Sequence, residues 1–389
     1  MTELERFKAV CHFEKPDYIP IFGFHGAPGM SHGAMRKTHE RLIAGGMPDW
    51  VDGSWSLETG GRSETWQRYW GTTGPLGPDF YPADPGGPGI ACERRLEGDR
   101  EIIEYDTGAL TSQVLENDVT YAMPQFIRYH IRDRASWELY RDKTAPGPRW
   151  SAERIEEACR RFDGRDRPLC IGVGSTWGTV RSLAGTEYAA TMLYDDPGLM
   201  HEIIEHFRWC NETYLFPLVE RLRPEIVATG EDCCYRSGML ISPRHFQEFC
   251  APTYRAIGQL ARDCNVDMVA IDTDGNAMEL VPLVEACGVN AIYPFEVKAG
   301  NDLFALRERH PRFLLMGWLE KECVNEGNGP MIEPEIMGKV PRLLEHGGYF
   351  PNGDHGLQPP VTFGNLCRFM TLLHEVTGNP EGEFPRVWA

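Results

Sequence analysis

The sequence predicts an α/β protein built as a (β/α)8 TIM barrel. Beyond about residue 165, short β-type runs alternate with longer segments of helical periodicity, which is the order of a parallel sheet covered by helices. An earlier apolar run at residues 19–24 supplies a further strand, and with it the number of strands fits a barrel better than an open sheet. With 389 residues and 42% apolar content, the chain can bury a core of this size.

The expected strands and helices follow one another in regular order. The strands cover residues 169–173, 226–229, 268–271, 291–294, 313–316 and 349–351. The helices cover residues 187–193, 199–222, 243–264, 278–287, 302–309, 334–346 and 363–376. Ser242 and Asp302 stand where helix N-caps belong, and Gly288 and Gly347 stand where helices end in the left-handed conformation.

Residues from about 45 to 125 differ in composition from the barrel segments. Trp50, Trp55, Trp66 and Trp70 are interleaved with glycine and proline, and residues 92–115 alternate polar and apolar side chains as a β-hairpin would. We interpret this Trp/Gly-rich region as an insertion near the N-terminal edge of the barrel, available for a lid or a subunit contact. Its aromatic side chains could equally be ordinary core. The chain is otherwise one domain over residues 1–389.

The charge of the chain excludes several kinds of partner. The formal net charge is −18, whereas nucleic acids and anionic membrane surfaces favour clustered lysine and arginine. No apolar run approaches the roughly 20 residues that span a bilayer, and the first residues lack the basic and apolar regions of a signal peptide. We therefore expect a cytoplasmic protein that binds neither nucleic acid nor membrane and acts on a small substrate or another protein.

Polar side chains follow most of the predicted strands. Two stretches, 269–275 and 348–356, run from apolar residues directly into acids, an imidazole and glycine, and burying such groups unpaired costs several kcal/mol. In a barrel the loops after the strands share one face, where barrel enzymes place their sites. The strand-end residues expected there are His25, Ser175, Thr176, Trp177, Glu231, Asp232, Tyr235, Asp272, Asp274, Asn276, Glu296, Glu320, Asp354 and His355.

Several carboxylates around one imidazole allow two kinds of chemistry. They can hold a divalent metal, whose charge relieves their mutual repulsion, and Zn²⁺, Mn²⁺ and Fe²⁺ all accept such ligands. They can also act as general acids and bases without a metal. Some members have a structural alternative as a helix cap or an ion-pair partner: Asp274 or Asn276 at the start of the next helix, Asp232 with Arg236, and Glu320 with Lys321 or as a cap.

Motifs along nearly the whole chain, apart from the Trp/Gly-rich region, resemble those of one superfamily. They include Glu5-Arg-Phe-Lys-Ala-Val, Lys15-Pro-Asp-Tyr-Ile-Pro-Ile, Glu231-Asp232, Leu240-Ile-Ser-Pro-Arg-His-Phe, Asp274-Gly-Asn, Pro294-Phe-Glu, Met316-Gly-Trp and Asp354-His-Gly. They are similar to the uroporphyrinogen decarboxylase superfamily, which also contains cobalamin-related methyltransferases. The resemblance implies a (β/α)8 barrel with its site at the C-terminal mouth.

The resemblance implies two candidate activities. True decarboxylases carry an Arg-Gln-Ala-Gly-Arg motif that binds porphyrinogen carboxylates, but here that place reads Phe24-His-Gly-Ala-Pro-Gly, and an acidic mouth is poorly suited to an octa-anion. The methyltransferase branch binds zinc through a His-x-Cys-Gly motif, where this chain reads Asp272-Thr-Asp-Gly, and a further cysteine near Asp354-His355. Oxygen ligands and an imidazole in place of thiolates suit a Lewis-acid role for the metal.

We therefore expect a metal-dependent methyltransferase that moves a methyl group from a small O- or N-methyl substrate to a corrinoid held by a partner protein. The expected ligands of the divalent metal, with zinc favoured, are Asp272, Asp274, Glu320 and His355. The expected catalytic residues are His355, Asp232 and Glu231, and the expected substrate-binding residues are His25, Trp177, Tyr235, Asn276 and Glu296. The alternatives are a metal-free decarboxylase and a non-catalytic member that binds a small ligand. Members of the superfamily are often dimers, so a homodimer is expected.

Overall fold

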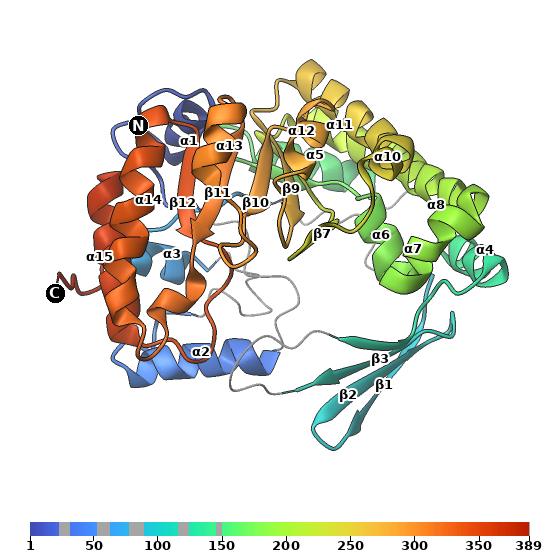
Figure 1. The fold of residues 1–389 in the computed structure, drawn as a ribbon, viewed down its shortest axis with the longest axis horizontal. Coiled ribbons are helices and arrows are strands. Elements are labelled where there is room, and N and C mark those ends of the chain that lie inside the picture. Colours follow the sequence, from blue (N-terminus) through green and yellow to red (C-terminus); the bar gives the residue numbers. More distant parts are fainter. Residues whose placement is uncertain (23–31, 53–62, 78–88, 116–123, 145–149, 389) are drawn as a thin grey trace.

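The computed structural model describes residues 1–22, 32–52, 63–77, 89–115, 124–144 and 150–388. Its centre is a six-stranded parallel sheet in the order β12-β11-β10-β9-β6-β5 (Figure 1). The strands are β5 (Cys170–Gly172), β6 (Ile226–Gly230), β9 (Met268–Thr273), β10 (Ala291–Pro294), β11 (Leu314–Leu319) and β12 (Tyr349–Gly353). All six strands predicted after residue 165 are therefore confirmed.

Helices alternate with these strands along the chain. Those of the C-terminal part are α6 (Trp177–Ala184), α7 (Thr186–Asp195), α8 (Pro197–Cys210), α9 (Phe216–Leu222), α10 (Pro243–His245), α11 (Ala251–Cys264), α12 (Leu280–Glu285), α13 (Leu303–Arg309), α14 (Ile332–His346) and α15 (Phe363–Thr377). The N-terminal part contributes α1 (Glu3–Cys11), α2 (His32–Ala44), α3 (Glu64–Trp70), α4 (Arg134–Lys143) and α5 (Ala152–Arg161). Every helix in the described part of the chain is too short or too polar to span a bilayer.

Two of the predicted helices are interrupted by π-helical turns. The predicted helix 199–222 is α8, a π turn at Asn211–Leu215 and α9, and the predicted helix 243–264 is α10, a π turn at Phe246–Cys250 and α11. Pro217 and Pro252 lie just after these turns. Because proline has no N–H and its ring clashes with the carbonyl four residues earlier, the preceding turn widens while the helix continues.

Side chains of the parallel sheet alternate between two cores. One face packs against the surrounding helices through residues that include Ile171, Val227, Ile271, Ile292 and Leu315. The other face forms a second cluster, which includes Cys170, Ile226, Met268, Ala291, Leu314, Phe350 and Phe22, together with Phe7 and Val10 of α1. The ring centroids of Phe7 and Phe350 are 5.4 Å apart. Since these strand residues lie near the beginnings of their strands, α1 covers the N-terminal end of the sheet.

Short bridged segments lie beside the two edge strands. Leu76 pairs in parallel with Leu169, next to β5, and Phe22 pairs in parallel with Thr73. Asn352 of β12 donates a side-chain hydrogen bond to the carbonyl of Phe22 at 3.2 Å. The α/β class and the parallel sheet are confirmed, and closure into an eight-stranded barrel stays a prediction. The predicted strand at 19–24 is represented by the single bridge at Phe22, because residues 23 and 24 lie outside the described part.

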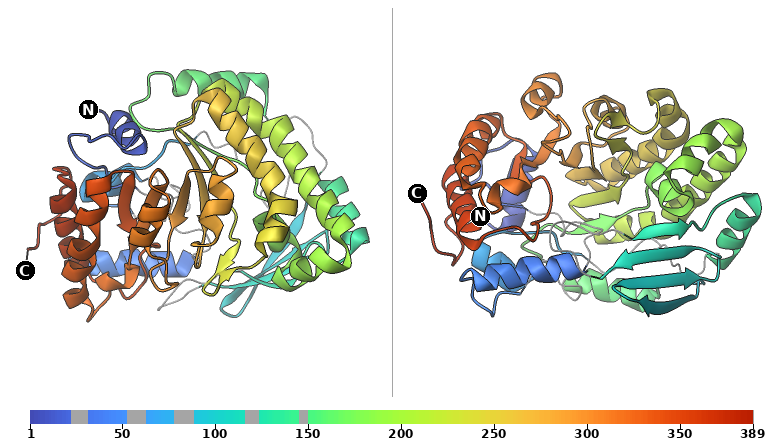
Figure 2. Two further views of the ribbon diagram at one scale, coloured as in Figure 1. Left: turned by 45° about the horizontal axis from the view of Figure 1, so that its top comes forward. Right: turned by 60° about the horizontal axis from the view of Figure 1, so that its bottom comes forward.

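A separate antiparallel sheet lies apart from the parallel one, as Figure 2 shows. Its strands are β1 (Cys92–Glu97), β2 (Arg100–Tyr105), β3 (Leu110–Val114) and β4 (Gln125–Arg128), paired in sequence order. The predicted hairpin at 92–115 is therefore a three-stranded meander. Trp66 and Trp70 are buried in the main core, which favours the core interpretation for these two rings, whereas Trp50 is exposed. Trp55 lies outside the described residues, and a lid or subunit contact stays a prediction.

Candidate functional site

The carboxyl ends of three strands bring three of the predicted site residues together. Asp274 follows β9, Glu296 follows β10 and His355 follows β12. One ligand atom from each of these side chains lies within 4.8 Å of the other two. Because parallel strands end at a common edge of the sheet, residues far apart in sequence meet there. We call these three residues the Asp274–Glu296–His355 cluster.

The imidazole of His355 lies between the two carboxylates. Its Nε2 atom is 3.0 Å from Oδ1 of Asp274, and its Nδ1 atom is 3.7 Å from Oε1 of Glu296. The second oxygen of Glu296 accepts a hydrogen bond from the N–H of Gly275 at 2.7 Å, which orients the carboxylate. Glu296, expected as a substrate-binding residue, thus belongs with the candidate metal ligands.

The contact between Asp274 and His355 changes the protonation of both groups. Burial alone would raise the pKa of Asp274 and lower the pKa of His355, but their mutual hydrogen bond and opposite charges outweigh burial. The pKa of Asp274 is therefore below its ordinary value and the pKa of His355 above it. A divalent cation among the same atoms would supply the positive charge instead and would require the neutral imidazole.

Asp272 lies beside the cluster and outside it. Burial raises the pKa of its carboxyl to about 7, and the charges of Asp274 and Asp232 add to the effect. Its backbone carbonyl accepts hydrogen bonds from the N–H groups of Glu231 and Asp232 at 2.8 and 3.2 Å. A predicted metal ligand is thus placed as a neighbour of the cluster, where a carboxyl that titrates near neutral pH is typical of functional sites.

Asp232 connects the ends of β6 and β9. One carboxylate oxygen pairs with the guanidinium of Arg181 in α6, and the other accepts a hydrogen bond from the N–H of Asp274 at 3.3 Å. The ion pair considered with Arg236 is therefore wrong, since Arg181 takes that place. Through this backbone contact Asp232 positions Asp274.

Glu231 makes the contacts of a structural carboxylate. Its side chain is buried and accepts hydrogen bonds from the N–H and hydroxyl of Thr176 at 3.0 and 2.8 Å, and from the N–H of Gly178 at 3.2 Å. A further hydrogen bond comes from the hydroxyl of Tyr254. Burial raises the pKa of Glu231 although these donors act in the opposite direction. The contacts hold α6 and α11 against the end of β6, which favours a structural role, and the expected catalytic role stays a prediction.

Glu320 also makes structural contacts, and its expected role as a metal ligand stays a prediction. It is the N-cap of a 3-10 turn, Lys321–Val324, where its side chain accepts a hydrogen bond from the N–H of Glu322 at 3.2 Å. Burial and the nearby charge of Asp354 raise its pKa. Within the described part of the chain, the group that could hold a metal contains Asp274, Glu296 and His355 and not Glu320.

The remaining substrate-binding candidates are dispersed. Trp177 is buried at the start of α6, while the side chain of Tyr235 is 67% exposed. Asn276 caps the turn before α12, because its side chain accepts from the N–H of Met278 at 3.1 Å and donates to the carbonyl of Ala299 at 3.0 Å. His25 lies outside the described residues. Contact of these residues with a substrate stays a prediction.

Gly275 allows the loop after β9 to pass close to Tyr235. Its φ is +82°, and a Cβ atom there would lie 2.5 Å from the carbonyl carbon and oxygen of Tyr235. The N–H of the next residue, Asn276, donates to that same carbonyl at 2.9 Å. The close approach of the backbone to Tyr235 therefore explains the glycine of the Asp-Gly-Asn motif. The same loop conformation positions Asp274 and the N–H of Gly275, which binds Glu296.

Three residues near the cluster were not expected as catalytic residues, substrate-binding residues or metal ligands. Asp354 is buried and accepts hydrogen bonds from the N–H groups of Val297 and Lys321 at 2.9 and 3.1 Å, which ties together the loops after β10, β11 and β12. The amino group of Lys321 is 3.9 Å from Asp354. Arg181, the partner of Asp232, is the third. Asp354 could have been identified from the sequence because it is adjacent to His355, whereas no motif marks Lys321 or Arg181.

Comparisons with known proteins agree with this architecture. The sequence model described as uroporphyrinogen decarboxylase (URO-D) matches residues 95–376. The chain therefore belongs to the uroporphyrinogen decarboxylase family, and the predicted superfamily is confirmed. No curated protein sequence matches the chain. A solved structure, a methyltransferase from Methanosarcina mazei, is similar with a TM-score of 0.58 and 15% identity, over 97% of this chain and 98% of that one. At this identity the similarity concerns the fold.

Proposed function

We propose that the protein is a metal-dependent methyltransferase that transfers a methyl group from a small O- or N-methyl substrate to a corrinoid bound by a partner protein. The observation that carries the proposal is the Asp274–Glu296–His355 cluster at the carboxyl ends of the strands. Membership of the family and the fold of a methyltransferase support an enzyme of methyltransferase type. The metal, the substrate class and the corrinoid partner are the proposed part.

The donor atoms of the cluster fit a divalent cation. Carboxylate oxygens and an imidazole nitrogen are ligands that Zn²⁺, Mn²⁺ and Fe²⁺ accept, and we propose Zn²⁺. Catalytic zinc sites commonly have three protein ligands and one position for water or substrate, and the cluster offers three. When bound, the ion would act as a Lewis acid on the oxygen or nitrogen that loses the methyl group.

The surrounding residues hold the three ligands in place. Asp232 accepts from the N–H of Asp274, Gly275 donates to Glu296, and Asp354 fixes the loop that precedes His355. Partners of this kind orient metal ligands, and their loss typically lowers metal affinity by about 10- to 100-fold. The cluster is thus supported by hydrogen bonds from three neighbouring loops.

Zinc titration of the purified protein tests the metal part of the proposal. We expect one zinc ion per chain, with Asp274→Asn and His355→Ala each lowering the affinity by more than about 100-fold, because each removes a ligand. Glu320→Gln is the matched control, since it removes a nearby carboxylate that caps a turn, and it should leave zinc affinity unchanged. Wild-type protein that binds no divalent metal, or His355→Ala protein that binds zinc normally, would refute this part.

Methyl transfer is tested separately with cob(I)alamin as the acceptor. The zinc-loaded protein is incubated with small methyl ethers and methylamines, and formation of methylcob(III)alamin is followed by its absorption spectrum. The family match also covers decarboxylases, so uroporphyrinogen turnover is assayed in parallel. Decarboxylation without methyl transfer, unaffected by removal of zinc, would favour the metal-free alternative.

A further inference from the structure

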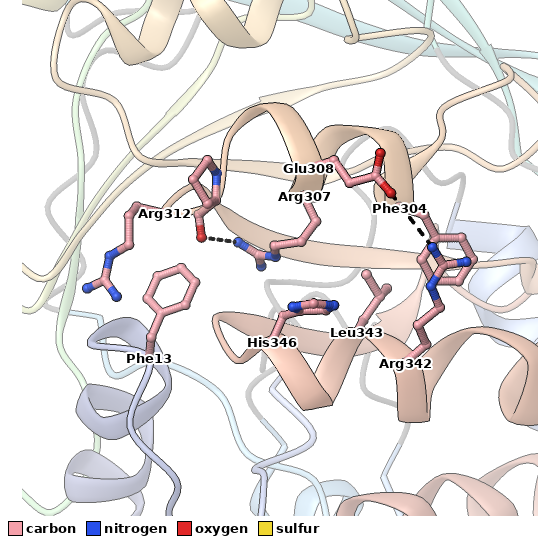
Figure 3. A pocket seen from close by; sticks show the side chains of 9 residues that line it. Phe13, Phe304, Arg307, Glu308, Arg312, Arg342, Leu343 and His346 are labelled. Atoms are coloured by element: carbon pink, nitrogen blue, oxygen red, sulfur yellow. Dashed lines mark hydrogen bonds and ion pairs between the residues drawn. The ribbon is translucent and has the colours of Figure 1, made fainter.

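Figure 3 shows a groove of about 560 Å³. The groove lies at the opposite end of the parallel sheet from the Asp274–Glu296–His355 cluster. It is formed by α13, the turn between α13 and β11, the end of α14, and Phe13, which follows α1. These segments precede β11 and β12, whereas Glu320 and His355 follow the same two strands. A six-residue strand spans roughly 20 Å, so the groove is a different place from the candidate metal centre.

The groove carries positive charge in a protein that is otherwise acidic. Its lining contains three arginines and one acid, Glu308, which gives a formal charge of +2 with His346 neutral, whereas the whole chain carries −18. Arg342 lies 3.9 Å from Glu308. Among the described residues, no acid lies within ion-pair distance of Arg307 or Arg312. Two neighbouring cations of the lining thus have no counter-charge from the protein.

Arg307 is 5% exposed, and neutral carbonyl groups surround its guanidinium. Its terminal N–H groups donate to the carbonyls of Pro311 and Phe313 and to those of Gly347 and Gly348, at 2.8 to 3.0 Å. These bonds join the turn before β11 to the turn before β12 and so build the wall of the groove. Burial, with a contribution from Arg312, lowers the pKa of Arg307 to about 10, which reflects the cost of a buried cation without an anion.

Aromatic rings fix the arginine side chains of the groove. The guanidinium of Arg312 lies 4.1 Å from the ring centroid of Phe13, that of Arg307 lies 5.0 Å from it, and that of Arg342 lies 4.0 Å from the centroid of Phe304. Figure 3 shows Arg307 and Arg312 on one wall, with His346, Leu343 and Arg342 on the other. The terminal N–H groups of Arg307 are taken by the four carbonyls, so a ligand would meet Arg312 and Arg342. A guanidinium stacked on a ring loses less conformational freedom on binding.

We propose that this groove binds a small organic phosphate, with the phosphate beside Arg312 and the rest of the ligand along Phe13 and Leu343. Arginine forks match phosphate oxygens in geometry and charge, and an anion here would compensate the two unpaired cations. Inorganic phosphate would fill only a small part of the groove, and four of the nine lining residues are apolar. The ligand therefore carries a ring or hydrocarbon body. This proposal does not rest on the proposed methyltransferase activity.

Calorimetric titration with phenyl phosphate, inorganic phosphate and phenol tests the proposal. We expect phenyl phosphate to bind about tenfold more tightly than inorganic phosphate, and phenol not to bind. Arg312→Gln should weaken the binding of phenyl phosphate by about tenfold, which corresponds to one charge-assisted hydrogen bond of about 1.4 kcal/mol. Arg309→Gln is the matched control, because it removes the same charge three residues earlier, at the end of α13 and outside the lining, and it should change the affinity less than about twofold.

Arg307 is left unchanged because its loss would release both turns and risk unfolding. The thermal midpoint of each variant shows whether it is folded, and Arg342→Gln gives a second test within the lining. No binding of phenyl phosphate at about 10 mM, a level that would detect a millimolar Kd, would overturn the proposal. Equal losses in the Arg312 and Arg309 variants, or equal affinity for inorganic phosphate, would also contradict it. Binding that depends on His355 would place the ligand at the other end of the sheet.

Discussion

Replacement of Glu231 separates a structural role from a catalytic one. The carboxylate accepts hydrogen bonds from four donors: the N–H and hydroxyl of Thr176, the N–H of Gly178 and the hydroxyl of Tyr254. Glu231→Ala leaves these buried donors without an acceptor, and each unsatisfied donor costs about 1–3 kcal/mol. Since such costs are not additive within one network, we expect a loss of about 4 kcal/mol in the free energy of unfolding, within the range of about 3–5 kcal/mol for breaking a buried charged network.

Tyr254→Phe removes one of the four donors and retains the carboxylate. The expected loss is about 1–2 kcal/mol, the contribution of one hydrogen bond to a buried acceptor. Asp232→Asn serves as the control, because its carboxylate is 37% exposed and its ion pair with Arg181 contributes at most about 1 kcal/mol. Urea denaturation followed by tryptophan fluorescence and far-UV circular dichroism gives the free energies, provided that the two signals coincide.

The reasoning fails if Glu231→Ala is as stable as the wild type, within about 1 kcal/mol, but has lost methyl-transfer activity. That result would assign Glu231 to catalysis, as its position at a strand end first suggested. Loss of stability in Glu231→Ala with normal zinc affinity in the folded fraction would agree with the structural role.

Further predictions concern other parts of the fold. Gly178→Ala should destabilise by several kcal/mol in urea, because its Cβ would lie 2.3 Å from the carbonyl oxygen of Glu231, and this clash exceeds a gain of about 1 kcal/mol in helix propensity. In Gly338→Ala the new Cβ would have no neighbour within 4 Å, so this variant should be more stable than the wild type by up to about 1 kcal/mol. A loss of stability in Gly338→Ala would contradict the argument that the clash, and not the residue type, destabilises Gly178→Ala. Burial, with a contribution from Arg386, lowers the pKa of His374 from 6.5 to about 4. The unfolded chain therefore binds the proton first, and about 3 kcal/mol of stability should disappear as the pH falls from 6.5 to 4. In His374→Gln the free energy of unfolding should fall less over that window, and an equal slope would refute the assignment. Asp302→Ala should cost about 1 kcal/mol in urea, since Asp302 caps two N–H groups of α13; an unchanged midpoint would show that the cap contributes nothing.

Local patterns made most of the fold predictable from the sequence. The apolar runs of the parallel strands stand out because both faces of this sheet are buried, and Asp302 and Ser242 cap their helices as expected. The π turns before Pro217 and Pro252 were not predicted, although each proline is visible in the sequence. A proline indicates that a helical hydrogen bond is missing, and it leaves open whether the helix ends, kinks or widens.

The sequence predicts the site only where the place of a residue at the end of a strand determines which other residues it meets. Asp274 and His355 meet because their strands end at the same edge of one sheet. Glu231 and Glu320 follow strands as well, but donors from distant helices or from the next turn bind their carboxylates, as Tyr254 does for Glu231. Such pairings depend on the packing of helices and leave no periodic signal. The same holds for the arginines of the groove, which α13, a turn and α14 bring together.

The distribution of cations supports the proposal that the Asp274–Glu296–His355 cluster holds a metal. Asp232 is paired with Arg181, and Asp354 lies beside Lys321, so these two carboxylates have permanent counter-charges. Among the described residues, Asp274 and Glu296 have ion-pair contacts only with His355, whose positive charge depends on a proton. That proton is exchangeable, whereas the charges of arginine and lysine are not at neutral pH. A divalent ion can therefore take the place of the proton without breaking any fixed ion pair, and the neighbouring loops already hold both carboxylates in position.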